Sequence, residues 1–67
     1  MKPNNLKKAR LKSKLTLAKL SQLSDVSIST IADIENYRTI PRVDTAQRLA
    51  ISLDIDLTKL FDYRELF

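Results

Sequence analysis

The sequence predicts an all-α fold, a compact domain of five short helices. Apolar residues recur at helical spacing, and residues that favour helix N-termini stand just before these runs. The 67-residue chain also contains no glycine, which argues against the tight hairpins of antiparallel sheets. At this length we expect residues 1–67 to form a single domain, near the lower size limit for a stable core.

The first three predicted helices cover the N-terminal half of the chain. The first spans about residues 5–13, with one face formed by Leu6, Ala9, Arg10 and Ser13. A second, over about 17–23, and a third, over about 28–36, follow Thr16 and Ser27, whose hydroxyls can accept bonds from free first-turn amides. Between them the apolar phase shifts at Ser24-Asp25-Val26, so one continuous helix cannot bury both runs.

The C-terminal half predicts two more helices. Pro41 favours an extended backbone before it, so residues 37–42 are expected to form a loop. A fourth helix should begin at Val43 or Asp44 and reach Leu53. A turn at 54–55 precedes a short fifth helix, about 57–61, for which Asp56 is the expected N-cap. The tail, residues 62–67, has no clear pattern.

Composition excludes several function classes. The chain has no cysteine and no histidine, which removes disulfides, the usual zinc sites and the common nucleophile and base pairs. Without glycine it cannot form phosphate-cradling loops or dinucleotide fingerprints. We therefore expect no enzyme, no metal and no cofactor. Apolar runs are short, so we also expect no signal peptide or membrane span, and a cytoplasmic location.

Charge is distributed unevenly along the chain. The formal net charge is +4, and the first nineteen residues contain basic but no acidic side chains, namely Lys2, Lys7, Lys8, Arg10, Lys12, Lys14 and Lys19. From Val43 onward acidic residues prevail. The pattern fits a solvated lysine-rich helix or a surface polarised toward an anion, and the paired helices at 17–36 favour a nucleic-acid partner.

Residues 16–35 contain a leucine followed by a small residue, a turn residue, an apolar residue followed by serine, two isoleucines and a glutamate: Leu20-Ser21, Asp25, Val26-Ser27, Ile31, Ile34 and Glu35. This order resembles the helix-turn-helix of phage-repressor and Cro-type (Xre-like) regulators. The resemblance extends over nearly the whole chain through Leu6, Arg10, Pro41, Leu49, Leu53, Ile55, Leu57 and Leu60. Three positions depart from the family: Asp25 and Tyr37 replace glycines, and Ser21 replaces an alanine.

The resemblance implies that the third helix enters the DNA major groove while the second lies across the backbone. If Ile31 and Ile34 point inward, the candidates for base contact are Ser27, Ile28, Ser29, Thr30 and Asp33. Isoleucine can contact a thymine methyl group, and serine or threonine can bond base edges or phosphates. Asp33 either accepts from a cytosine amino group or is a solvated charge that excludes wrong sequences. Leu17 either contacts a thymine or packs against Leu15 or Leu20.

The expected phosphate contacts flank these residues. Thr16 and the first amides of its helix can form an anion site. By the resemblance, the sugar-phosphate backbone would also be held by Asn36, Arg38, Thr39 and Arg42. Arg10 lies on an apolar face, where a charge needs a partner, and we expect a structural ion pair with Glu35.

The tail contains apolar residues beyond what a small core needs: Tyr63, Leu66 and Phe67. They either form a dimer interface or close the core. We expect a homodimeric, sequence-specific regulator of transcription that binds double-stranded DNA, as a repressor on a palindromic operator, without a small-molecule ligand. Two alternatives remain: an antitoxin-type protein-interaction module, and an architectural or excision factor of a mobile element.

Overall fold

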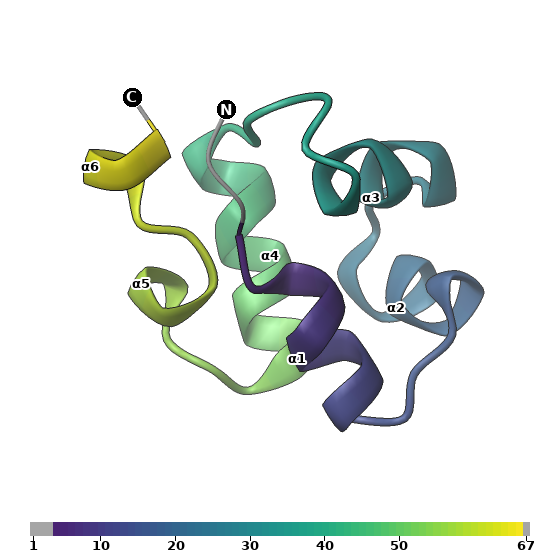
Figure 1. Ribbon diagram of the computed structural model, residues 1–67. Coiled ribbons are helices and arrows are strands. Elements are labelled where there is room, and N and C mark those ends of the chain that lie inside the picture. The colour runs from purple at the N-terminus through teal and green to yellow at the C-terminus, as the bar shows by residue number, and fades with distance from the viewer. Residues whose placement is uncertain (1–3, 67) are drawn as a thin grey trace.

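The computed structural model describes residues 4–66, with side chains to residue 64, and within this range the chain is all-helical without strands (Figure 1). The helices are α1 (Leu6–Lys12), α2 (Leu17–Ser24), α3 (Ile28–Glu35), α4 (Val43–Leu53), α5 (Leu57–Leu60) and α6 (Tyr63–Leu66). The five predicted helices are therefore confirmed, to within one residue at each end. The additional turn, α6, lies in the tail, where the sequence has no clear pattern.

The helices enclose one hydrophobic core, in which α4 is the central element. Helices α2 and α5 pack against α4, and α3 packs against both α1 and α2. In Figure 1, α2 and α3 lie on one side of the molecule and α5 and α6 on the other. The buried apolar side chains come from α1 to α5 and the adjoining segments: Leu6, Leu20, Val26, Ile31, Ile34, Ala46, Leu49, Ala50, Leu53, Leu60 and Phe61.

Four helix ends have a left-handed backbone at a residue other than glycine, with φ between 54° and 61°, at Lys14, Asp25, Tyr37 and Asp54. After α1, α3 and α4 the next amide donates to a carbonyl five residues earlier, as in a Schellman motif, from Leu15 to Arg10, Arg38 to Asp33 and Ile55 to Ala50. Aspartate tolerates this conformation because its short side chain can bond locally. Lys14 and Tyr37 lack that compensation.

The three expected N-cap residues are in place, and two of them, at α2 and α3, make a side-chain capping bond. Thr16 Oγ1 accepts a bond from Lys19 N (3.0 Å), and Ser27 Oγ accepts one from Thr30 N (3.2 Å). Asp56 is the N-cap residue of α5, as predicted, but its side chain makes no capping bond. Its carboxylate is exposed to water, and a backbone bond from Lys59 N to Asp56 O (3.0 Å) closes the single turn instead.

Two asparagines attach the start of α1 to distant elements. Asn4 Nδ2 donates to Ile34 O at the end of α3 (3.0 Å). Asn5 donates twice to the last turn of α5, from its backbone amide to Leu60 O (3.0 Å) and from Nδ2 to Lys59 O (2.9 Å). The first helix is thereby linked to both sides of the molecule. Over the range 4–66 no helix has the length and apolar character that crossing a membrane requires.

Candidate nucleic-acid interface

The turn between α2 and α3 is fixed by buried groups. Asp25 ends α2 in the left-handed conformation, and Val26 is buried directly after it. Ser24, to which no role was assigned from the sequence, is also buried, and its Oγ donates to Leu20 O (2.7 Å) and accepts from Val26 N (3.3 Å). These bonds satisfy backbone groups that the turn would otherwise bury unpaired. The sequence does contain a signal for this role, because Ser24 is a small hydroxyl residue in the last turn of the second helix.

The outer face of α3 carries short side chains. Ile31 and Ile34 are fully buried, as the phase of the helix predicts. Ile28 is 47% exposed and Ser29 is exposed, while Ala32 and Asp33 are partly exposed. Ala32 was not among the predicted base-contacting residues, although it lies one helical turn after Ile28 on the same face. Its small side chain allows this face to approach a neighbouring surface closely.

The hydroxyl groups at the start of α3 differ in their availability. Ser27 Oγ caps the helix and also donates to Thr30 Oγ1 (2.7 Å), so these two hydroxyls already bond each other. Ser29 Oγ lies 3.4 Å from Ser27 Oγ, at the long end of hydrogen-bonding distance. Ser29 is therefore the most available donor of the three.

Two residues with different predicted roles are joined in the structure. Arg38 Nη1 lies 3.3 Å from Asp33 Oδ1, and both side chains are largely exposed, at 69% and 48%. The Schellman bond from Arg38 N to Asp33 O (2.9 Å) places the two residues together. Exposed pairs of this kind contribute only about 0–1 kcal/mol, so Arg38 can exchange Asp33 for another anion.

The remaining predicted phosphate contacts lie at the surface around α2 and α3. Thr16, Thr39 and Arg42 are exposed, and Arg42 stands at the N-terminus of α4. Asn36 is exposed as well, with its Nδ2 bonded to Ala32 O (2.8 Å). Leu17 is partly buried and packs against the core, as Leu15 does. Of the two roles considered for Leu17, the structure therefore shows the packing role.

Arg10 and Glu35 form the expected pair between α1 and α3. Arg10 Nε donates to Glu35 Oε2 (2.7 Å) and Nη2 donates to Oε1 (3.1 Å), while Nη1 donates to Leu15 O (2.8 Å). The two residues are only 8% and 7% exposed. The bond to Glu35 raises the pKa of Arg10, an effect that burial opposes. The pair fixes the C-terminal end of α3 against α1.

The tail residues expected at a dimer interface are only partly described. Tyr63 is partly buried against the core, and its hydroxyl donates to Pro41 O (2.8 Å). Burial raises the pKa of Tyr63, and the negative charge of Asp44 raises it further. Tyr63 therefore packs on its own chain, as the core-closing alternative proposed. Phe67 and the side chain of Leu66 lie outside the described part of the chain.

Two short helices joined by a tight turn, the second with exposed short polar residues at its start, define a helix-turn-helix domain. The model of the helix-turn-helix family matches residues 6–60, and the chain belongs to this family, which is of the Xre and Cro type. The family is one of DNA-binding regulators. Among curated proteins, none matches the sequence closely enough to count as a relative.

Proposed function

We propose that this protein is a sequence-specific transcription regulator that binds double-stranded DNA as a homodimer and represses by occupying a palindromic operator. The observation that carries the proposal is the exposed face at the start of α3, with Ile28 and Ser29 held at fixed positions by the buried Ile31 and Ile34. Helices inserted into the major groove contact base edges through their N-terminal residues.

We assign roles to the individual residues as follows. The base contacts are Ile28 and Ser29 first, then Asp33, with Ser27 and Thr30 at the mouth of the helix. Leu17 supports these residues by packing and touches the groove only through its exposed part. The phosphate contacts are Thr16, Asn36, Arg38, Thr39 and Arg42. The Asp33 carboxylate near phosphates is unfavourable unless it is paired, and either Arg38 or a cytosine amino group can pair it.

Selection of bound duplexes from a random pool tests sequence specificity directly. We expect the full chain alone to enrich one palindromic sequence. Affinity for that sequence should fall with salt, with a log-log slope of roughly -0.9 for each phosphate neutralised. Enrichment of nothing, or binding only when a partner protein is added, would favour the antitoxin-type module. Bound duplexes that are bent without sharing a sequence would favour the architectural factor.

Single substitutions separate base contacts from phosphate contacts. Ser29→Ala should relax the preference at one base pair and cost about 1–3 kcal/mol on the selected site. Arg42→Ala should weaken all duplexes about equally. Two residues of α4 outside the proposed sites serve as matched controls: Ser52→Ala, which removes a hydroxyl that donates to Arg48 O, and Arg48→Ala, which removes an exposed arginine. If Arg42 alters base preference and Ser29 does not, the placement of α3 in the groove is wrong.

We propose that the tail forms the two-fold interface through Leu66 and Phe67. Support comes from Tyr63, which ties α6 to the loop before α4 by its bond to Pro41 O (2.8 Å). A two-fold pair must place its recognition helices about one DNA turn apart, roughly 34 Å. Deleting residues 65–67 keeps Tyr63 and should yield a folded monomer with weak operator binding. A truncated chain that still sediments as a dimer would place the interface elsewhere.

A further inference from the structure

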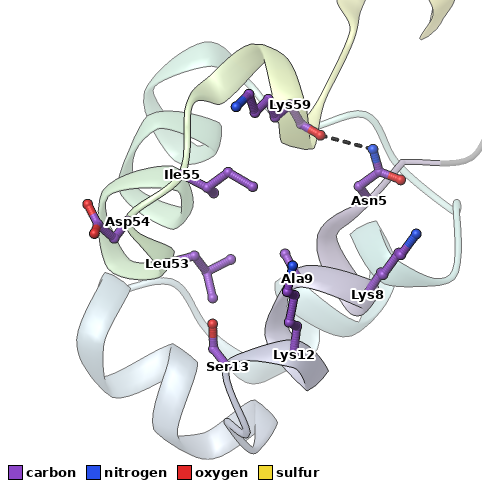
Figure 2. Close-up of a pocket in the computed structure, with 9 residues that line it drawn as sticks. All are labelled: Asn5, Lys8, Ala9, Lys12, Ser13, Leu53, Asp54, Ile55 and Lys59. Atoms are coloured by element: carbon purple, nitrogen blue, oxygen red, sulfur yellow. Dashed lines mark hydrogen bonds between the residues drawn. The ribbon is translucent and has the colours of Figure 1, made fainter.

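A groove of about 540 Å³ separates α1 from the turn between α4 and α5 (Figure 2). Sites for small molecules commonly have roughly 300–1,000 Å³. None of the residues that line the groove belongs to the interface proposed for DNA. Helix α5 also lies on the opposite side of the molecule from α3 (Figure 1). Occupancy of the groove is therefore compatible with DNA bound at α3.

The floor of the groove is apolar. The side chains of Ala9, Leu53 and Ile55 point toward its centre (Figure 2). Ala9 and Ile55 are only partly buried, and both pack against the core. A ligand with an apolar portion would remove this concave surface from water, which is favourable by the hydrophobic effect.

The rim of the groove is cationic. Lys8 and Lys12 on α1 and Lys59 on α5 line it, and all three are exposed. None of them pairs with a carboxylate in the part of the chain whose side chains are described. Asp54 also lines the groove, but its carboxylate points away from the centre (Figure 2). Two of the lysines that suggested a nucleic-acid partner thus lie beside this groove.

One end of the groove is closed. Asn5 Nδ2 donates to Lys59 O (2.9 Å) across it, shown as the dashed line in Figure 2. An extended peptide needs a channel open at both ends, whereas a compact ligand does not. The sequence predicted no small-molecule ligand, because the chain has no room for a second, ligand-sensing domain. The floor residues come from α1, from α4 and from the turn after it, and they form no local motif.

We propose that this groove binds a small molecule with an anionic head group and a short apolar tail. The tail lies on Ala9, Leu53 and Ile55. The head group lies at the rim near Lys12, and the exposed, flexible side chains of Lys8 and Lys59 can turn toward it, although the Lys8 ammonium points outward in Figure 2. The proposal is independent of the proposed function, since it uses none of the DNA-contacting residues.

Octanoate, below its micellar concentration, is a suitable probe of this site. We expect saturable shifts in the amide NMR signals of residues 8–13 and 53–59 of the full chain. Acetate lacks the tail and should bind at least about tenfold more weakly, because each buried methylene adds favourable transfer energy. Octanol lacks the charge and should also bind more weakly. Equal responses to octanoate and octanol would overturn the proposal. So would shifts centred on Leu23 of α2 and Ile28 of α3, two exposed apolar residues that do not line the groove.

A double variant that removes two lysine charges tests whether the head group lies at the rim. The double substitution Lys8→Gln and Lys12→Gln should weaken octanoate about three- to tenfold and leave octanol unchanged. Lys7→Gln is the matched control, because Lys7 is exposed on α1 but does not line the groove. All the substituted side chains are exposed, so the variants should keep the parent helical signal. If Lys7→Gln weakens octanoate as much as the double variant, the head group does not lie at this rim.

Discussion

Two ion pairs involve the same helix, α3, and differ in burial and geometry. Arg10 and Glu35 are buried and meet through two bonds, of 2.7 and 3.1 Å. Arg38 and Asp33 are exposed and meet through one contact, of 3.3 Å. Removing one partner of a buried pair leaves the other charge without water or a counter-charge, which costs much stability. In an exposed pair water and salt screen the charges, so the same loss costs little.

The two pairs therefore have different roles on the inner and the outer side of α3. The buried pair fixes the end of the helix on α1, so the fold depends on it. The exposed pair lies on the outer side and can be exchanged for another anion at little cost to the fold. Residues on the same helix can therefore be needed either for stability or for contact with a partner, and burial decides between the two.

The largest expected effect is that of Glu35→Gln. The substitution leaves Arg10 buried without a counter-charge, so the free energy of unfolding should fall by about 3–5 kcal/mol in urea denaturation. For a small domain this loss can mean unfolding. The double variant Arg10→Met and Glu35→Leu removes both charges and should recover much of the loss. A Glu35→Gln protein as stable as the parent would contradict the comparison.

Tyr37, at the exit of α3, offers a stabilising change. Its φ of 61° is unfavourable for a side chain with a Cβ atom. Tyr37→Gly should raise the free energy of unfolding by about 1 kcal/mol, which is a melting temperature higher by roughly 4–8 °C. Tyr37→Ala keeps the Cβ atom and serves as the control. If alanine stabilises as much as glycine, the left-handed backbone is not the source of the gain.

Tyr63→Phe tests the bond that ties α6 to the loop after α3. Loss of the bond to Pro41 O (2.8 Å) should lower the free energy of unfolding by about 0.5–1.5 kcal/mol. The experiment is urea denaturation at neutral pH. An unchanged midpoint would mean that water replaces the bond fully.

The same residue predicts a dependence on pH. Burial, and to a smaller extent the negative charge of Asp44, raise the pKa of Tyr63 in the folded state above the ordinary tyrosine value of 10.0. Its contribution is therefore complete below about pH 10 and is lost as pH rises through the higher folded pKa. The parent should lose stability in this range more steeply than Tyr63→Phe. Parallel curves for the two proteins would contradict the prediction.

The smallest effect is expected for the exposed pair. Arg38→Ala and Asp33→Asn should each change the free energy of unfolding by less than about 1 kcal/mol, and the difference should shrink in high salt. Urea denaturation at low and high ionic strength provides the measurement. A loss as large as that of Glu35→Gln would mean that both pairs are structural.

The helix boundaries could be predicted because their signals are local. Thr16 and Ser27 each cap the helix that follows them, and the spacing of Ile31 and Ile34 gives the buried side of α3. The same phase places Glu35 inward, where a cation on α1 can reach it. These inferences need only the geometry of a single helix.

Other features depend on how the chain packs, which no local pattern reveals. The contact of Arg38 with Asp33 requires the left-handed conformation of Tyr37, whose family counterpart is glycine. The role of Tyr63 depends on the position of Pro41, a residue on a distant loop. The contacts with DNA bases follow only from the family resemblance and from exposure, so they remain predictions.

The two hydrogen bonds from Asn5 to the last turn of α5 determine when the chain can fold during its synthesis. During translation, α1, α2 and α3 leave the ribosome first, but the amides of Asn5 find their acceptors only once Lys59 and Leu60 emerge. Leu60 and Phe61, which are almost fully buried, arrive at the same moment. We therefore expect a nascent chain that ends before this point to remain unfolded, and the domain to form in one cooperative step once residues 59–61 have left the ribosome.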